Sequence, residues 1–403
     1  MRKKIYSYLK FFIKIRVVHF LRNVFLFLFG ARPNRENWEK RILIINLEAI
    51  GDMVVFTSVL KHYKKAFPDK KIYLLLKEEI SVVEDLILPF VDQIVFINYR
   101  KFGLNPFYGA KILNALKNTG FQKIINHDFS AAEIIGRIIS INVGGEEIIG
   151  YEGYGLSFNR PFDLNMKKNL DFVEKNIYPY FTKIIPSIDR RQPFKLPLTH
   201  AIDHYKIIYE TISGRKEMDY STQIFLGDKT VPIPNGKYAI IVLGSSVAYK
   251  NWPVERFAEV SKVFKEKGWK VVLLGSPNEK YLAKKFVELY DGDCLNLVGQ
   301  FNISGVAQMI NSAELLLSND TGPVHIAVAL KKPSVAILGG GHFGIISLYG
   351  NPEINKWVYK KQDCFGDNWR CIHNVAPGQP AQCVESVSVN DILPVVRQLM
   401  LVQ

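Results

Sequence analysis

The sequence predicts an α/β protein with two doubly wound parallel sheets. The chain has 403 residues, whereas a single hydrophobic core stops growing at about 250–300 residues. Short apolar segments typical of buried parallel strands alternate with helical segments in two blocks, which begin at Arg41 and Tyr238. A less regular region rich in Tyr, Phe, Pro and Asn separates them. We therefore expect an extension over residues 1–40, one domain with an irregular linker over 41–235, and a second domain over 236–403.

The first block alternates strands and helices with short connections. Pro68 ends its first helix, because proline cannot continue a helical hydrogen-bond ladder. Strands are expected at Ile42 to Asn46, Ile72 to Leu76, Ile94 to Ile97 and Lys123 to Asn126. Helices are expected at Asp52 to Phe67, Val82 to Leu88, Tyr108 to Lys117, Ala131 to Ile139 and Ile202 to Ile212.

The second block repeats this alternation, and Gly268 ends its first helix. Strands are expected at Ala239 to Leu243, Lys270 to Leu274, Leu295 to Val298, Leu315 to Leu317 and Ser334 to Leu338. Helices are expected at Val254 to Lys267, Glu279 to Leu289, Val306 to Asn311, Pro323 to Leu330 and Asp391 to Leu401. Paired domains of this kind commonly bind a ligand in the cleft between them, at the carboxyl ends of the strands.

Basic charge is concentrated at the start of the chain. The formal net charge is +14, which favours an anionic partner. The first 35 residues hold nine Lys or Arg and no Asp or Glu, with aromatic and aliphatic residues between the charges. Lys14, Arg16 and Arg22 interrupt the apolar run, which disfavours both a spanning helix and a secretory signal. We expect an amphipathic segment on an anionic membrane surface. The alternative is a helix packed on the protein's own core.

Cysteine usage indicates a reducing compartment. Four cysteines in a chain of this length are too few for a disulfide-stapled scaffold. Cys364, Cys371, His373 and Cys383 could in principle bind a metal, but they lack the paired Cys-x2-Cys spacing typical of zinc sites. We expect packed free thiols, no metal site and no cofactor.

The segment Ser318 to His325 joins a predicted strand to a helix. Pro323 suits the first helical turn. The free N–H groups of Thr321 and Gly322, together with the helix dipole, predict an anion site that fits a diphosphate. His325 lies one turn into the helix and could face the same ligand. The alternative is an ordinary N-cap made by Asp320 or Thr321.

Two further polar loops follow predicted strands of the second block. Ser245 and Ser246 could approach phosphate oxygens, and Lys250 could neutralise charge on a departing diphosphate. Glu279 could accept hydrogen bonds from ribose hydroxyls. The alternatives are a solvated lysine and a carboxylate that stabilises a helix N-terminus.

Asp52 is the candidate general base of the first domain. Gly51 permits a tight turn after the first strand, so Asp52 would lie at a helix start facing the cleft. The alternative is a capping aspartate. The missing G-x-G-x-x-G after this strand disfavours a dehydrogenase, and no P-loop lysine motif is present.

The order and spacing of these motifs resemble glycosyltransferase family 9, which includes the ADP-heptose:lipopolysaccharide heptosyltransferases. The resemblance covers about residues 41–400 and is most specific at Asp320 to Leu330. The segment Trp252 to Ala258 is also similar. It implies a GT-B fold, in which two Rossmann-like domains face each other across a cleft. It also implies a metal-independent, inverting transfer of a sugar, heptose from ADP-heptose, to a lipopolysaccharide-core or other lipid-linked glycan.

The resemblance also implies roles for individual residues. Asp52 would be the catalytic base and Lys250 the leaving-group lysine. The donor would be bound by seven residues: Ser245, Ser246, Glu279, Asp320, Thr321, Gly322 and His325. Together with the basic start of the chain, this resemblance predicts a cytoplasmic enzyme that residues 1–35 hold peripherally on the inner face of the cytoplasmic membrane.

Two departures from the family leave alternatives open. The loop Gly339 to Gly344 replaces a Gly-x-Thr-x-Pro-like loop, so another nucleotide sugar could be the donor. The basic extension is also longer than the start typical of the family. Rival functions are a nucleotide-sugar epimerase, a cofactor-dependent oxidoreductase, and a non-catalytic protein that binds a membrane surface or another anion. No RNA-binding signature is evident, and we expect no nucleic-acid partner.

Overall fold

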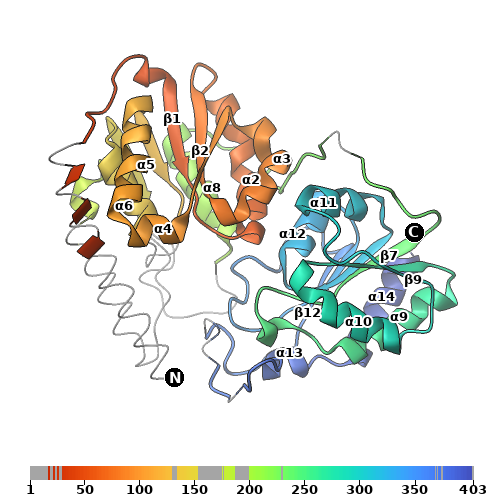
Figure 1. Cartoon of the computed structure of the whole chain (residues 1–403). Coiled ribbons are helices and arrows are strands. Elements are labelled where there is room, and N and C mark those ends of the chain that lie inside the picture. Colours follow the sequence, from red (N-terminus) through yellow and green to blue (C-terminus); the bar gives the residue numbers. More distant parts are fainter. Residues whose placement is uncertain are drawn as a thin grey trace.

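Two parallel β-sheets, each wrapped by helices, form the protein (Figure 1). The computed structural model describes residues 17–18, 21–22, 25–26, 30–128, 134–152, 175, 177–186, 199–227, 230–367, 369, 371–373 and 375–401. Both sheets have six described strands in the order typical of a dinucleotide-binding fold, with the first strand of each half at the centre. The predicted pair of doubly wound, Rossmann-like sheets is confirmed.

The first sheet has the order β3-β2-β1-β4-β5-β6, and every neighbouring pair is parallel. We call this sheet and the elements on it the first half. Its strands are β1 (Arg41–Ile45), β2 (Lys71–Lys77), β3 (Gln93–Ile97), β4 (Lys123–Asn126), β5 (Glu147–Tyr151) and β6 (Lys183–Ile185). Its helices are α2 (Ile50–Ala66), α3 (Glu84–Ile87), α4 (Tyr99–Leu104), α5 (Pro106–Thr119), α6 (Ile134–Val143) and α8 (Ala201–Ser213).

The second sheet has the order β12-β11-β10-β7-β8-β9, again all parallel. We call it and its helices the second half. Its strands are β7 (Tyr238–Val242), β8 (Lys270–Leu274), β9 (Cys294–Asn296), β10 (Leu315–Asn319), β11 (Ser334–Ile337) and β12 (Asn355–Val358). Its helices are α9 (Val254–Glu266), α10 (Lys280–Leu289), α11 (Ile303–Ser312), α12 (Gly322–Ala329), α13 (Gln382–Glu385) and α14 (Val389–Leu401).

Several edge elements were not predicted from the sequence. β6 is three residues long, and β12 contains Lys356 and Trp357, so neither has the apolar run of a central strand. The helix expected at Ala131 to Ile139 begins at Ile134 among the described residues, since 129–133 lie outside them. The edges of the sheets are therefore where the sequence pattern is weakest.

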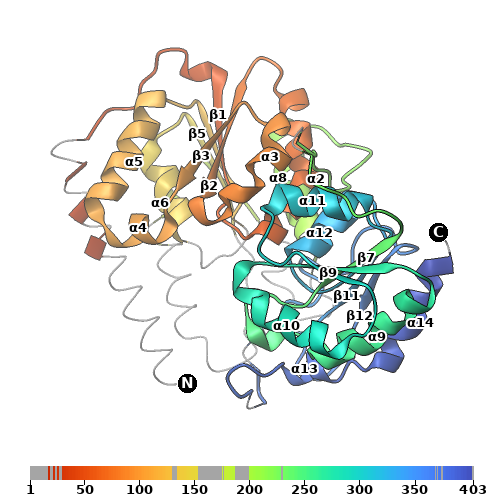
Figure 2. The same cartoon turned by 45° about the vertical axis from the view of Figure 1, so that its right-hand side comes forward.

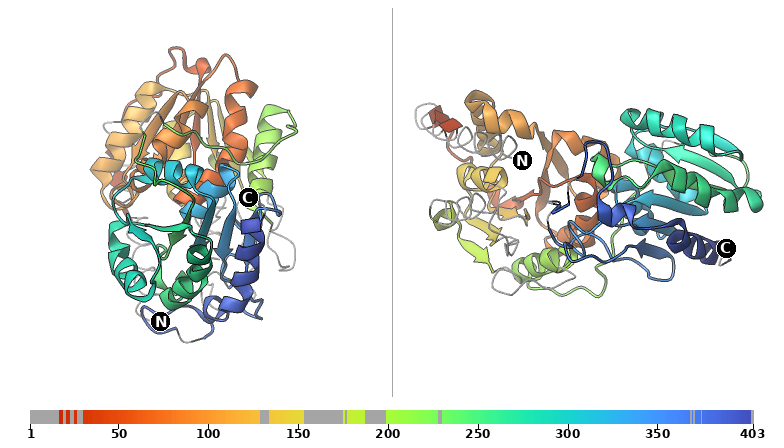
Figure 3. Two further views of the ribbon diagram at one scale, coloured as in Figure 1. Left: turned by 90° about the vertical axis from the view of Figure 1, so that its right-hand side faces the viewer. Right: turned by 90° about the horizontal axis from the view of Figure 1, so that it is seen from below.

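The two halves meet through helices rather than through their sheets. One hydrophobic cluster includes residues of α2 and α8 from the first half and of α11 and α12 from the second. Two other clusters lie each within one half. Figure 2 shows α11 and α12 next to α2, and the right-hand view of Figure 3 shows the two halves side by side. Apolar burial therefore extends across the junction.

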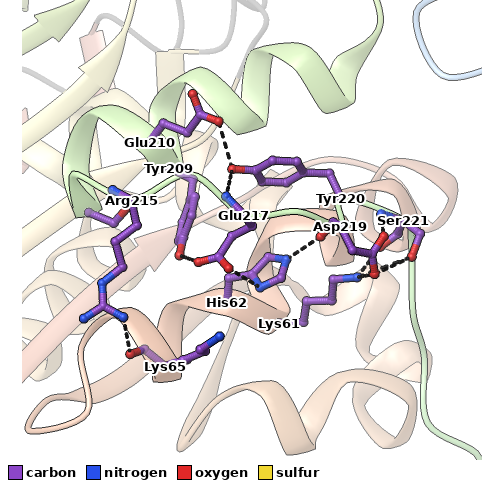
Figure 4. Close-up of polar contacts among 11 residues, drawn as sticks. Lys61, His62, Lys65, Tyr209, Glu210, Arg215, Glu217, Asp219, Tyr220 and Ser221 are labelled. Atoms are coloured by element: carbon purple, nitrogen blue, oxygen red, sulfur yellow. Dashed lines mark hydrogen bonds and ion pairs between the residues drawn. The ribbon is translucent and has the colours of Figure 1, made fainter.

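A polar network ties the segment after α8 to the first half (Figure 4). Lys61 Nζ contacts Asp219 Oδ2 at 2.9 Å and Ser221 O at 2.8 Å, and His62 Nε2 lies 2.8 Å from Asp219 O. The Lys61 hydrogen bond is the largest cause of the lowered pKa of the Asp219 carboxyl. Further contacts join Tyr209 to Glu217, Glu210 to Tyr220, and Arg215 to Lys65 O.

This segment stays with the first half until Phe225 and then reaches the second. Gln223 N donates to Thr57 Oγ1 at 3.0 Å, and Phe225 N donates to Leu86 O at 2.9 Å. Val231 N donates to Gln308 Oε1 on α11. The linker thus changes partners between residues 225 and 231.

The N-terminal segment packs on α4 and α5 where it is described. Arg22 is 1% exposed, its Nη2 donates to Phe102 O at 2.6 Å, and burial lowers its pKa to about 10. Phe25 packs edge-to-face on Phe107. Part of the predicted amphipathic segment, including residues 1–16, lies outside the described residues. Among the described helices, none combines the length and hydrophobicity needed to cross a bilayer.

Candidate active site

The starts of α2 and α12 face each other where the halves meet. The backbone of Gly51 lies against the His325 imidazole so closely that an added Cβ would be 2.7 Å from His325 Cδ2. An added Cβ at Gly322 would be 3.3 Å from Ile50 Cγ2. Each half therefore contributes one helix N-terminus, with its partial positive charge, to a common region.

Asp52 is the third residue of α2 and is partly buried. Its Oδ2 accepts a hydrogen bond of 3.3 Å from Ala49 N, so it caps its own helix as the alternative interpretation expected. Burial raises the pKa of this carboxyl to about 6, although Ala49 N–H and the charges of Lys250 and Lys77 oppose the shift. A carboxylate with a pKa near neutrality is suited to accept a proton at physiological pH.

Lys250, Asp320 and His325 form a cluster in the second half. Lys250 Nζ lies 3.6 Å from Asp320 Oδ2, and His325 Nε2 lies 3.9 Å from Asp320 Oδ1. Asp320 follows β10 and is 7% exposed. Burial lowers the pKa of His325 to about 4, despite the opposing Asp320 charge. His325 is therefore neutral at pH 7, and Lys250 is the cation of this cluster.

Asn319 fixes the Lys250 loop beside β10. Its Oδ1 accepts from Trp252 N at 2.8 Å, and its Nδ2 donates to Leu243 O at 2.8 Å. Trp252 is buried and its Nε1 donates to Val387 O at 2.7 Å. The loop between β7 and α9 is therefore held against the end of β10, which explains how Lys250 reaches Asp320.

The start of α12 has free backbone donors. Thr321 is the N-cap residue, with extended backbone, but its side chain makes no capping hydrogen bond. Gly322 and Pro323 form the first turn. Among the described residues, the alternative of a side-chain cap by Thr321 is thus not observed, which leaves the N–H groups of this turn to an anionic ligand.

The two serines differ in their surroundings. Ser245 Oγ lies 2.7 Å from Val247 O and 2.9 Å from Asn251 Oδ1, so this hydroxyl stabilises its own loop. Ser246 is exposed. Of the two, Ser246 is the more accessible to a ligand.

Glu279 lies between the ends of β7 and β8. It forms a capping box with Ser276, and burial raises the pKa of its carboxyl. An added Cβ at Gly244 would be 2.5 Å from Glu279 Cδ, and one at Gly275 would be 2.2 Å from Glu279 Oε2. The helix-stabilising role is therefore observed, and the two glycines leave room for the carboxylate at this edge.

Aromatic rings pack directly on the loop Gly339 to Gly341. Added Cβ atoms at Gly339 and Gly341 would come within 2.5 Å of the Trp369 ring, and one at Gly340 would meet Phe365. Lys250 Nζ lies over the same Trp369 ring, 4.7 Å from its centroid. The glycines at this departure from the family are thus required by side chains from the C-terminal segment.

Sequence reasoning missed Tyr349, Trp369 and His200. Tyr349 OH lies 2.9 Å from His325 Nδ1, and the His200 ring lies 5.0 Å from the Tyr349 ring. These residues come from three distant parts of the chain and match no short motif. Only the folded arrangement brings them to the site.

The cysteines are free thiols in the structure. Cys383 Sγ accepts a hydrogen bond of 3.4 Å from Gly340 N, and burial raises the pKa of its thiol. Over the described ranges, no three His, Cys, Asp or Glu side chains gather in a way that could hold a metal ion.

Comparison with known proteins supports the resemblance to family 9. The model of Glycosyltransferase family 9 (heptosyltransferase) matches residues 214–370, which include Lys250, Asp320 and His325. Lipopolysaccharide heptosyltransferase 1 of Campylobacter coli is 25% identical over 378 residues, covering 89% of this chain and 98% of the relative. The chain is therefore similar to glycosyltransferase family 9, as its motifs predicted.

Solved structures of the family share the fold. A family 9 glycosyltransferase of Veillonella parvula superposes with a TM-score of 0.71 at 19% identity, over 92% of this chain and 100% of the other. The E. coli heptosyltransferase WaaC, solved with ADP-2-deoxy-2-fluoro heptose, gives 0.58 at 18% identity, over 89% and 99%. The predicted GT-B arrangement is confirmed, and the chain is a glycosyltransferase.

Proposed function

We propose that this glycosyltransferase transfers heptose from ADP-heptose to an acceptor in the lipopolysaccharide core. The proposal rests on one arrangement at the junction: a carboxylate of the first half lies close to a polar cluster of the second half. Asp52 comes from the first half, while Lys250, Asp320 and His325 come from the second. The names of the relatives support the donor and the acceptor class.

The proposed reaction is a single displacement with inversion. The Asp52 carboxylate takes the proton of an acceptor hydroxyl, and that oxygen forms a bond to the anomeric carbon of the donor. The bond between the anomeric carbon and the β-phosphate oxygen breaks, and ADP leaves with the electron pair. Lys250 and the N–H groups of Thr321 and Gly322 neutralise the departing diphosphate.

The remaining predicted residues would bind the rest of the donor. Ser246, exposed beside Lys250, would contact a phosphate oxygen, and Ser245 would hold the loop that presents it. Glu279, at the ends of β7 and β8, would accept a hydrogen bond from a ribose hydroxyl. Asp320 and His325 would face the sugar. Holding acceptor oxygen, anomeric carbon and leaving phosphate in line supplies much of the acceleration.

The test is turnover with defined donors. Full-length protein is incubated with a heptose-free core oligosaccharide and ADP-heptose, ADP-glucose, UDP-glucose or GDP-mannose, and product is detected by mass. We expect addition of one heptose from ADP-heptose only, and a rate at least about a hundredfold lower with Asp52→Asn. If only a different nucleotide sugar supported transfer, the enzyme would be a glycosyltransferase with that donor instead of ADP-heptose. Absence of both turnover and nucleotide binding would favour the non-catalytic alternative.

The enzyme is further proposed to act at the inner face of the cytoplasmic membrane. Val17 is 53% exposed, Leu21 50% and Phe107 67%, while Arg22, one position after Leu21, is buried against Phe102. The packing of Phe25 on Phe107 supports one apolar surface shared by the segment and α5. Nine basic and no acidic residues in the first 35 favour anionic lipid.

Vesicle flotation tests this surface. We expect the full chain to float with vesicles containing phosphatidylglycerol and not with phosphatidylcholine alone. Leu21→Asp with Phe107→Asp should reduce flotation about tenfold, because two charges would enter the apolar interface. Tyr180→Asp, at a residue that is 65% exposed elsewhere on the first half, is the matched control. Equal flotation of the double variant and the control would contradict the proposal.

A further inference from the structure

Tyr349 is fixed against the donor-side histidine. It lies in the loop between β11 and β12, and its OH is 2.9 Å from His325 Nδ1. The two rings stack, with centroids 5.8 Å apart and an interplanar angle of 15°. Trp357 Nε1 donates to Tyr349 O at 3.0 Å, which holds the backbone of the tyrosine as well. Both the position and the direction of its hydroxyl are thus defined by the second half.

Tyr349 also contacts the first half. Burial raises the pKa of the Tyr349 phenol, and the Thr222 side chain lies close enough to oppose that shift. The His200 ring, at the start of α8, lies 5.0 Å from the Tyr349 ring. Close by, Ala201 N donates to Ile345 O at 2.7 Å. Thr222 directly follows Ser221, the last residue of the polar network that fixes this segment to α2 and α8 (Figure 4). Tyr349 is therefore contacted by both halves at once.

The contacts of His325 select one tautomer. His325 is buried and neutral at pH 7, because burial lowers its pKa to about 4. If the Tyr349 hydroxyl donates to Nδ1, then Nε2 carries the hydrogen and faces Asp320 Oδ1 at 3.9 Å. The other tautomer would turn a lone pair toward this carboxylate oxygen, which is unfavourable. Asp320 Oδ1 has no hydrogen-bond partner among the described residues, so the region between the two groups can take a hydroxyl of the sugar.

We propose that Tyr349 is a positioning residue that fixes the tautomer and ring orientation of His325 and makes both depend on contact between the two halves. Tyr349 acts through His325 and touches neither sugar nor phosphate. Because Thr222 and His200 reach Tyr349 only when the halves meet, the donor side is completed only in the closed arrangement. The effect on transfer rests on the proposed function, whereas the state of His325 can be measured without it.

Kinetics of Tyr349→Phe test the proposal, because this change removes the hydroxyl and keeps the ring. We expect kcat to fall about fivefold to tenfold, the effect of one lost hydrogen bond. KM for the nucleotide sugar and Kd for ADP should stay within about twofold, since the diphosphate contacts are intact. Thr222→Val should lower kcat in the same direction, by about threefold. Tyr359→Phe, at a partly exposed tyrosine on the same half, should change nothing.

A double variant asks whether Tyr349 acts through His325. Once His325→Ala has removed the imidazole, adding Tyr349→Phe should cost no further activity. Additive losses would overturn the proposal, because Tyr349 would then act independently of His325. Melting temperatures of all variants show whether each one folds. If Tyr349→Phe does not fold, Thr222→Val carries the test from the other half.

Nitrogen NMR of the histidine rings gives a signature that a merely structural role would not produce. The chain has eight histidines, and His325→Gln assigns the signal of interest in the ADP-bound protein. We expect the Nε2–H tautomer in the wild type, a changed tautomer in Tyr349→Phe, and no change in Tyr359→Phe. Wild-type kcat together with an unchanged His325 signal in Tyr349→Phe would overturn the proposal. A wild type inactive with ADP-heptose but showing this signature would reject only the proposed donor.

Discussion

The starts of α2 and α12 face each other but are built differently. At α2, the side chain of Asp52 accepts Ala49 N–H, so the helix start is occupied by its own carboxylate. At α12, Thr321 makes no side-chain cap, and the nearby carboxylate of Asp320 pairs with Lys250 instead. One helix start therefore carries a negative group with a raised pKa, and the other leaves its N–H groups to an anion. In the proposed reaction, this difference separates an acceptor side from a donor side.

Removal of the α2 carboxylate should have the largest effect on activity. Asp52→Asn should lower kcat about 10²- to 10⁴-fold, because no group on the acceptor side would then take the hydroxyl proton. ADP should bind as in the wild type, since the diphosphate contacts lie in the second half. Steady-state rates and calorimetric ADP titration measure the two quantities separately.

Glu79→Gln is the matched control for this change, because Glu79 is an exposed carboxylate after β2 in the same half. It should retain wild-type kcat. If Asp52→Asn kept more than a tenth of the wild-type rate, the acceptor-side role of α2 would be wrong.

Removal of the donor-side cation should be the next largest effect. Lys250→Ala should lower kcat about 10²-fold, because charge on the departing phosphate would lose its cationic partner. It should also weaken ADP binding, which Asp52→Asn should not do. Fluorescence or calorimetric titration with ADP measures this contrast between the two sides.

Lys280→Ala is the control here, because Lys280 is an exposed lysine at the start of α10. If Lys250→Ala bound ADP as tightly as the wild type, Lys250 would not contact the diphosphate. The proposed donor side would then be wrong.

The raised pKa of Asp52 predicts the pH dependence of the rate. The base must be deprotonated, and burial raises its pKa to about 6. kcat/KM should therefore be constant above about pH 7 and fall about tenfold per pH unit well below 6. His325, with a pKa lowered to about 4, should not contribute to this limb. A kcat/KM profile between pH 4.5 and 8.5 measures the midpoint, and a flat profile down to pH 5 would contradict a base with this pKa.

The two sides were not equally predictable from the sequence. Strands β1, β7 and β10 each contain an apolar run, so the polar residues that follow these runs, such as Asp52 and Asp320, could be expected near the sheet edges. The residues around them come from weaker patterns. Tyr349 lies in a loop, and Trp369 belongs to an irregular segment that packs on Gly339 and Gly341. No local pattern encodes such long-range contacts, because they depend on how the two halves meet.

The smallest expected effect concerns the glycine between the two helix starts. In Gly51→Ala, the new Cβ would lie 2.7 Å from His325 Cδ2, so the buried imidazole or the junction must shift. A strain of about 1–1.5 kcal/mol would lower kcat/KM about tenfold. Gly322→Ala is the matched change on the other helix, with 3.3 Å to Ile50 Cγ2, and should cost less than about threefold. The kinetics of both variants are measured again in a His325→Ala background. This comparison shows whether a clash with the imidazole causes the loss. Gly51→Ala could instead lower kcat/KM by the same factor in the wild-type and His325→Ala backgrounds. The close approach of α2 to His325 would then not limit the rate, and the two helix starts would act separately.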